Sequence, residues 1–323
     1  MRLLTIIVLA LAALYSAYWV TGRYAVTRGT DTVLTDLRDA GWTVETTDIS
    51  TRGYPSRFDT TATDIALTTP DGAVTWTAPF VQVFALSYAP TRIIAAFPPE
   101  QTLALPGLTL RLSADGLRAS AATRPTPDLP LSEAIVESGP LTLAADIGGT
   151  LTATRALMAL RATDAPARYD VFAELTGIVP PALVTAPLTA GTDLPDTLDA
   201  LRLDGTVTLD APLDRHATAA RPTALTLRDA SLRWGPARLA LSGALTFDTA
   251  GRASGTLTLD ADALPALIAL ATNARLIDPD AAPGILATIA GIADGDTLTA
   301  PITISDGVAS IGFVPLGTIP PLP

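Results

Sequence analysis

The chain has 323 residues, of which 48% are hydrophobic, and a formal net charge of −11. This composition excludes wholesale disorder, and the length permits one or two domains with a substantial core. The charge argues against nucleic acid as a partner, because neutralising phosphates requires a concentrated basic face and the 21 basic residues, all arginine, are scattered singly.

The first apolar run, residues 3–20, contains no charged residue. As a helix it would be about 27 Å long, which is close to the thickness of the hydrocarbon core of a bilayer. A signal peptidase site needs small residues just after such a run, but Tyr15, Tyr18 and Trp19 lie there. We therefore predict an uncleaved membrane anchor over residues 1–28, with Tyr15, Tyr18, Trp19 and Tyr24 as an interfacial belt. The anchor is represented by Leu3, Ile6, Ile7, Leu9, Leu14, Tyr18 and Trp19.

A short amphipathic helix is predicted next, over residues 30–40, with Thr30 or Asp31 as its cap and Gly41 as its end. Alternation and threonine-rich runs then predict strands, which prolines and glycines separate. The predicted strands are residues 42–50, 58–69, 74–78, 80–88, 92–97, 103–112 and 117–121. The proline-rich residues 124–130 divide an amino-terminal β-rich part (29–123) from a carboxy-terminal one (124–323), and a single continuous domain is the alternative.

In the second part, residues 141–147, 168–176 and 201–209 read as strands, whereas Leu157, Met158 and Leu160 have helix-compatible spacing within 152–161. A short helix is predicted within 180–196. A helix over 262–277 is predicted to start with Asp262 as cap and Pro265 in its first turn. A buried helix over 283–293 and a hairpin of 298–304 with 308–314 complete the chain.

Residues 223–260 show the clearest alternation, with turn signals at Gly235-Pro236 and at 248–251. Short loops between such strands predict an antiparallel meander with one apolar face. We therefore predict a mainly β (α+β) fold with antiparallel meander sheets, sandwich-like or groove-like, a few short covering helices and one amino-terminal transmembrane helix. The candidate apolar groove consists of Leu239, Leu241, Leu245, Phe247, Leu257 and Leu259.

No catalytic, cofactor-binding or metal-binding residue is predicted. The chain has neither lysine nor cysteine, which excludes a P-loop, a Schiff base, thiol catalysis and cysteine zinc sites. The single histidine, His216, lies in a polar, loop-like stretch. Carboxylates such as Asp193 and Asp199 stand beside prolines, as solvated turns do.

Two motifs carry a resemblance to a known family. One is Gly53-Tyr54-Pro55-Ser56-Arg57, and the other is Trp234-Gly235-Pro236 within a leucine-rich strand block. With the anchor and the proline-rich ending, they resemble the bacterial domain-of-unknown-function family 2125 over nearly the whole chain. The strand block is similar, more weakly, to AsmA-like envelope proteins. This second resemblance implies a single-pass protein of the bacterial inner membrane with its sheet in the periplasm and a role in lipid or envelope homeostasis.

The arginines flanking the anchor, Arg2 against Arg23 and Arg28, do not fix its orientation, but long domains translocate largely regardless of charge. We expect the body outside the cytoplasm. Three functions stay open. The apolar face is an open groove that binds or transfers lipid, or it closes into the core of a structural envelope protein with a protein partner and no ligand. An enzyme using Asp/Glu pairs or a divalent metal is the third hypothesis.

Overall fold

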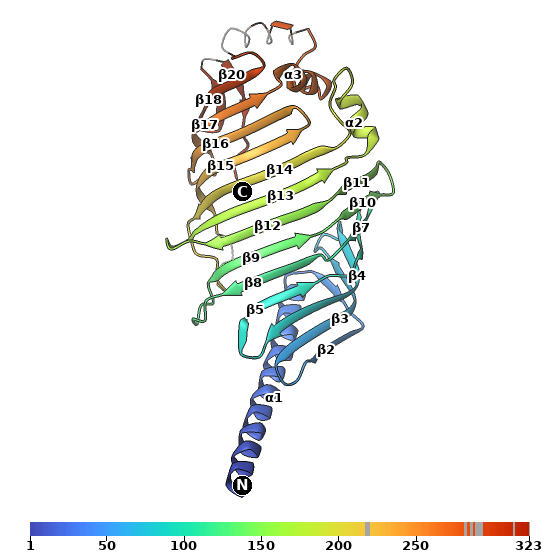
Figure 1. Ribbon diagram of the computed structural model, residues 1–323, viewed down its shortest axis with the longest axis vertical. Helices are drawn as coiled ribbons and strands as arrows, with labels where there is room; N and C mark the ends of the chain where they lie inside the picture. Colours follow the sequence, from blue (N-terminus) through green and yellow to red (C-terminus); the bar gives the residue numbers. More distant parts are fainter. Residues whose placement is uncertain (217–219, 281–282, 285–286, 288–292, 313, 323) are drawn as a thin grey trace.

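The computed structural model describes residues 1–216, 220–280, 283, 284, 287, 293–312 and 314–322. Every pairing between its twenty described strands, β1 to β20, is antiparallel, and the pairings join them into one open sheet (Figure 1). The predicted mainly β, antiparallel fold is therefore confirmed. The helix predicted over 283–293 falls mostly on residues outside the described ones.

The larger part of the sheet is a meander in which each strand pairs with the next one along the chain. Figure 1 shows these strands stacked along the long axis of the molecule. They are β12 (Arg155–Ala162), β13 (Arg168–Ile178), β14 (Leu198–Leu209), β15 (Pro222–Trp234), β16 (Ala237–Phe247), β17 (Ala253–Asp262), β18 (Thr297–Ser305), β19 (Val308–Ile311) and β20 (Val314–Thr318).

The sheet divides at β4 (Thr75–Leu86), which pairs with different strands at its two ends. One branch leads to β12 through β5 (Ala89–Ala96), β8 (Arg118–Thr123) and β9 (Leu131–Ser138). The other branch consists of β6 (Glu100–Leu105), β7 (Leu108–Ala114), β10 (Leu141–Ala145) and β11 (Gly149–Ala153). On its remaining edge β4 pairs with β3 (Arg57–Thr68), which carries β1 (Thr43–Glu45) and β2 (Asp48–Arg52). The β8–β9 and β7–β10 pairings each join a strand that precedes residue 124 to one that follows it, so hydrogen bonds connect the two predicted parts of the chain.

One helix prediction and one strand boundary were wrong. Residues 152–161 form the end of β11 and most of β12 and not a helix, because alternate residues Ala156, Met158 and Leu160 fit a strand as well as a helix face. Pro79 does not end a strand but lies within β4. It is tolerated there because β4 pairs with β6 through residues 75–77 and with β5 through residues 82–86, so Pro79 lies between the two ladders.

The helices also differ from the predictions. α1 (Arg2–Asp39) is continuous through Gly29, and Thr30, one of the two predicted caps, instead donates its hydroxyl to the Val26 carbonyl inside the helix. The predicted end holds, because Gly41 follows the helix with a φ of 88°. α2 (Ala182–Leu188) is the short helix predicted within 180–196.

α3 (Leu264–Asn273) begins at residue 264, whereas a cap at Asp262 would make residue 263 the first of the helix. Asp262 remains a paired residue of β17, opposite Arg238 and Thr297, and so it cannot cap the helix. Ala263, in the left-handed conformation with a φ of 59°, occupies the cap position. Pro265 lies in the first turn, as predicted.

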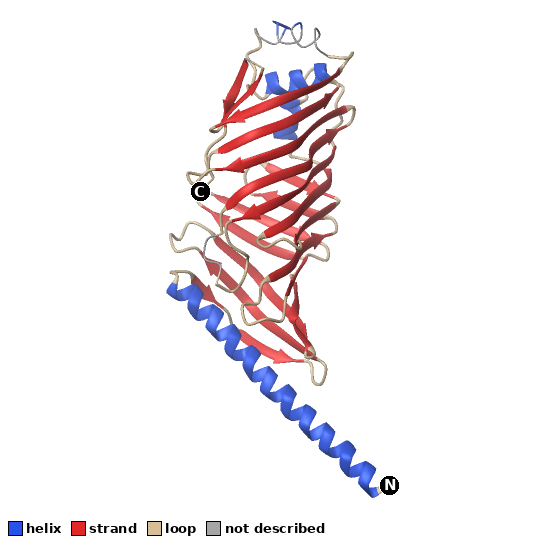
Figure 2. Ribbon diagram, turned by 90° about the vertical axis from the view of Figure 1, so that its left-hand side faces the viewer, coloured by secondary structure: helices blue, strands red, loops and turns tan. Residues whose placement is uncertain are grey.

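α1 docks on the sheet through the aromatic side chains that the sequence assigned to a membrane belt. Trp19 is only 6% exposed, lies with its ring centroid 5.9 Å from that of Phe58, and donates from Nε1 to the Arg57 carbonyl at 2.9 Å. The Tyr15 and Tyr18 hydroxyls donate to the carbonyl oxygens of Pro55 and Ser87. These three residues thus bind the body, a role that the belt prediction did not include. Figure 2 shows the carboxy-terminal part of α1 alongside the sheet and its amino-terminal part projecting beyond it.

The docking can be tested with two glycines of the same helix. Alanine at an open helix position adds roughly 0.5–1 kcal/mol of stability. Nothing lies within 4 Å of a Cβ at Gly29, whereas a Cβ at Gly22 would lie 2.5 Å from Cζ of Phe58, which is buried under Trp19. We expect Gly29→Ala to keep or raise the melting temperature and Gly22→Ala to lower it, since overpacking costs about 1–3 kcal/mol. Thermal unfolding in detergent by circular dichroism measures both, and equal melting temperatures would contradict the docking.

Candidate functional site

The register of the sheet places a row of apolar residues from ten strands on one face. Directly paired residues project to the same side of a sheet, so the pairings can be followed from strand to strand. The row runs from β5 to β18 without a polar residue. Its members are Ala95, Ala119, Val136, Met158, Ala173, Leu203, Ala230, Leu241, Leu259 and Ala300.

Two further rows flank the first at a distance of two residues along each strand, or three between Leu227 and Ala230 of β15, and they share its face. Together the three rows form what we call the apolar face. One flanking row consists of Ala156, Leu175, Leu201, Leu232, Leu239, Ala261 and Leu298. The other consists of Ile93, Ala121, Ala134, Leu160, Val171, Gly205, Leu227, Gly243, Leu257 and Ile302.

A bulge in β15 keeps the leucines on this face. Leu227 pairs with Gly243 but Ala230 pairs with Leu241, so β15 contains one residue more than β16 over this interval. Leu225 and Leu227 would otherwise project to the side opposite from Ala230 and Leu232. Arg228, within the bulge, donates to the Gly205 carbonyl at 2.9 Å and to Asp204. The apolar pattern therefore continues across a change of phase in the sequence.

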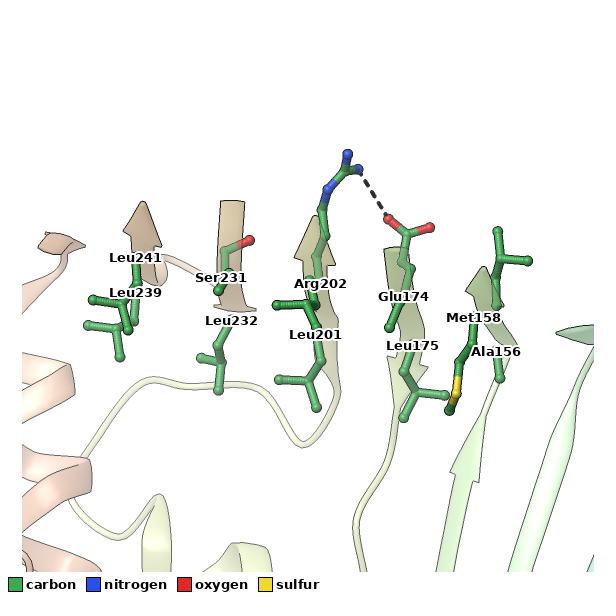
Figure 3. A pocket seen from close by; sticks show the side chains of 14 residues that line it. Ala156, Met158, Glu174, Leu175, Leu201, Arg202, Ser231, Leu232, Leu239 and Leu241 are labelled. Carbon is green, nitrogen blue, oxygen red and sulfur yellow. Dashed lines mark ion pairs between the residues drawn. The ribbon is translucent and has the colours of Figure 1, made fainter. Parts of the chain in front are cut away.

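The middle of the apolar face is hollowed and open. A pocket of about 360 Å³ lies over β12 to β16, and its apolar floor includes Met158, Leu175, Leu201, Leu203 and Leu239. Figure 3 shows the labelled leucines and Met158 on one side of the strands, whereas Arg202, Glu174 and Ser231 point to the other side. Met158, Leu201, Leu203, Leu239 and Val136 are each at least 37% exposed. Large apolar side chains from four strands, β9, β12, β14 and β16, thus face solvent on the same side of the sheet.

One margin of this face is covered. Trp234, Ile178 and Ala153 belong to a buried cluster against which Leu267 and Leu270 of α3 and Leu151 of β11 pack. An isolated pairing of Thr152 with Val179 ties β11 to the end of β13. The second branch of the sheet and α3 therefore form a wall along one side of the hollow, and they leave its floor uncovered.

The six predicted groove residues all lie on the apolar face or at its edge. Leu239 and Leu241 line the hollow, and Leu259 continues the middle row. Leu245 and Leu257 are buried in a cluster with Ile304, and Phe247 packs against that cluster. The hollow also uses β12, β13 and β14, which the prediction left out. Alternation in 168–176 and 201–209 was the available signal for two of these strands.

The opposite face is polar and carries cross-strand ion pairs. Arg202 lies within 3.5 Å of carboxylate oxygens of Glu174, Asp204 and Asp229. Arg228 lies 3.2 Å from Asp170, which also accepts a hydrogen bond from the Thr206 hydroxyl at 2.8 Å. The Thr206 hydroxyl, followed by Arg228, holds the pKa of Asp170 below its ordinary value of 3.8. Over β13 to β15 the sheet is therefore amphipathic, with one face suited to water and one that is not.

The motif residues hold the margins of the sheet together. The Gly53 to Arg57 turn receives α1, and Gly53 has a φ of 109° with no room for a Cβ beside the Arg57 carbonyl. The Trp234 indole donates to the Pro195 carbonyl at 2.6 Å, and the Gly235 amide donates to Asp199 at 2.7 Å. Pro236 follows in the same β15–β16 turn. None of these contacts forms a reactive constellation.

Groups that could support catalysis are dispersed. His216 lies in an exposed turn, with Nε2 3.6 Å from Asp128 and with Arg215 beside it. Asp199, at the start of β14, accepts from the Gly235 amide of the β15–β16 turn. Asp278 accepts from the Asp280 amide, as in an ordinary turn. Within the part of the chain that the structure describes, no group of three or more His, Cys, Asp or Glu residues is arranged to hold a metal ion.

Comparison with known proteins gives one match. The model of a family described as "Uncharacterized protein conserved in bacteria (DUF2125)" matches residues 19–320. No curated protein and no solved structure matches the chain. Among the described helices, α1 alone is long and apolar enough to cross a membrane.

The polar face predicts an effect of pH on stability. Because the pKa of Asp170 is lowered on folding, its contribution is fully present above 3.8 and is lost as the pH falls through the folded pKa. We expect Asp170→Asn to melt at a lower temperature than the parent protein at about pH 7 and the difference to narrow at about pH 3. Asp164→Asn, in the exposed turn after β12, is the control and should differ little at either pH. A difference that widens on acidification would contradict this assignment.

Proposed function

The chain belongs to the bacterial DUF2125 family, and we propose that it is a membrane-anchored protein that binds lipid acyl chains along its apolar face. α1 would anchor it in the inner membrane as a single span, and residues 29–323 would form one body in the periplasm. The function follows from a surface and involves no chemical reaction.

The open floor over β12 to β16 carries this proposal. A large aliphatic side chain that stays in water forgoes roughly 1.5–3 kcal/mol of burial free energy. Four such side chains, Met158 of β12, Leu201 and Leu203 of β14 and Leu239 of β16, are exposed on this floor, and Val136 of β9 is exposed beside Met158. A contiguous apolar surface of this kind marks a site for an apolar ligand or partner. Lipid is the partner that a membrane-anchored protein meets first.

The dimensions fit an acyl chain. Adjacent strands lie about 4.8 Å apart, so the five strands from β12 to β16 span about 19 Å. One leaflet of a bilayer contributes about 15 Å of hydrocarbon, which is the length of an acyl chain lying straight. A chain crossing these strands would contact the middle row in each of them. Each methylene group removed from water would contribute about 0.8 kcal/mol.

The closed-core alternative explains less of the structure. A closed sandwich requires the apolar residues of two facing sheets to contact one another across about 10 Å. Here Leu267, Leu270 and Leu151 cover only one margin, and Met158 and Leu203 remain exposed. A scaffolding function would require a protein partner that covers the floor. Crosslinking distinguishes such a partner from lipid.

Adjacent residues of β12 provide a matched test. Met158 lies on the apolar face, and Leu157 pairs with Glu174 on the polar face. We expect p-benzoylphenylalanine at position 158 to crosslink to lipid on irradiation of cells, because its side chain would lie against the acyl chain. The same group at position 157 should give no lipid adduct. Mass spectrometry of the purified full chain identifies the adducts.

Each other outcome is informative. Lipid adducts of equal yield at both positions would indicate general contact with membrane and contradict a specific face. A crosslink from position 158 to another protein would favour the scaffolding function. No adduct at position 158, with an intact anchor, would contradict a ligand-binding role for the hollow.

The location of the body has its own test. The chain contains no cysteine, so a single introduced one reports its surroundings. Ile147 is 71% exposed in the turn between β10 and β11. We expect Ile147→Cys to react with a membrane-impermeant maleimide in cells whose outer membrane has been permeabilised. Reaction only after lysis of the inner membrane would place the body in the cytoplasm instead.

A further inference from the structure

The uncharged segment of α1 is longer than the part that projects from the body. Arg2 and Arg23 bound twenty uncharged residues, 3–22, which as a helix span about 30 Å. This is the thickness of the hydrocarbon core of a bilayer. The contacts with the body begin at Tyr15, so residues 3–14 alone project freely, over about 18 Å.

The docking contacts therefore lie within the membrane-spanning segment. Tyr15 bonds to the Pro55 carbonyl, Tyr18 to that of Ser87 and Trp19 to that of Arg57. If residues 3–22 occupy the hydrocarbon core, the body's end reaches roughly 10 Å below the hydrocarbon surface. The end in question consists of residues 53–56, in the β2–β3 turn, and residues 86–88, in the β4–β5 turn. We call it the docked end.

The surface of the docked end is suited to lipid. Tyr54 and Tyr88 are 56% and 73% exposed. Leu86, in the same turn as Tyr88, adds an exposed aliphatic side chain. Tyrosine is enriched where a protein crosses the membrane interface, because its ring is apolar and its hydroxyl is wet. Two arginines flank the 53–56 turn: Arg52 ends β2, and Arg57 is ion-paired with Asp59 at 3.0 Å.

Several backbone groups at the docked end have the internal partners that lipid requires. A polar backbone group in hydrocarbon must have an internal partner, because no water is available there. The Ser87 amide donates to the Ser56 carbonyl and the Arg57 amide to the Gly53 carbonyl, both at 2.9 Å. The carbonyl oxygens of Pro55, Ser87 and Arg57 accept from the side chains of α1. Turns in water need no such pairing.

We infer that the docked end is immersed in the outer part of the bilayer, with the lipid surface itself as its binding partner. The inference rests on the proposed anchoring by α1 and deepens it, because the apolar face starts at this end. Ile93 of β5, the strand that leaves the 86–88 turn, is 41% exposed and is the first member of a flanking row. An acyl chain could thus pass from the leaflet to the apolar face without crossing water.

The depth of three single-cysteine variants of the full chain tests this inference. Each is spin-labelled and reconstituted in vesicles of phosphatidylethanolamine and phosphatidylglycerol. The relaxation of each label is then measured with oxygen, which concentrates in lipid, and separately with a water-soluble nickel chelate. Leu9→Cys reports the anchor, Tyr88→Cys the docked end, and Ile147→Cys an exposed turn in the middle of the long axis (Figure 1).

We expect oxygen to relax the labels at positions 9 and 88 more strongly than nickel does, and the order to reverse at position 147. A label at position 88 that resembles the one at 147, while position 9 is in lipid, would overturn immersion and leave the anchor standing. A label at position 9 in water would overturn both the anchor and this inference. Labels at 88 and 147 that are equally lipid-exposed would contradict an immersion confined to the docked end.

Discussion

The register of the antiparallel ladder is the constraint on which the rest of this structure depends. Side chains alternate with a period of exactly two residues, so a slip of one residue in any strand would move its leucines to the polar face. The row from Ala95 to Ala300 exists only because nine successive pairings are in phase. Where the sequence itself changes phase, between Leu227 and Ala230, the bulge in β15 restores it. Arg228 binds Asp204, Asp170 and the Gly205 carbonyl around this bulge, so the polar face fixes the register that the apolar face requires.

The sequence predicts the strands and their apolar face where apolar residues alternate with a period of two and show no helix-like spacing. Residues 223–260 alternate clearly enough that the strands and their turns follow from the chain alone, but the common apolar face also depends on the bulge between Leu227 and Ala230. Residues 152–161 do not, because Leu157 lies on the polar face next to Met158 and gives the run a helix-like spacing. The position of Met158 in the hollow depends on its pairing with Ala173 and Val136, and such long-range partners leave no local trace. The same limit applies to Trp19, because its contact with Phe58, far along the chain, leaves no local trace in the sequence.

Covering the face is a matter of geometry more than of composition. The two branches that leave β4 come together at the pairing of Thr152, in β11, with Val179, just after β13. There Trp234 and Ile178 are buried and α3 adds Leu267 and Leu270. Strands farther from that margin have no layer above them among the described residues, and their leucines stay exposed. Hydrophobic burial thus stabilises the margin and leaves the floor as the less stable, more adaptable surface, which is the usual place for a binding site.

Continuity between α1 and the sheet gives the floor a defined orientation. A membrane protein whose anchor ends in a flexible linker presents every face of its body to the bilayer in turn. Here the helix continues from Arg2 to Asp39 without a break, and Trp19 and Phe58 fasten it to β3 before it ends. The orientation of β3 then fixes that of β4 and β5, and the ladder carries it to β18. Because each strand is fixed by its pairing with the previous one, three aromatic side chains of α1 set the direction in which Ile93, Met158 and Leu239 face relative to that helix.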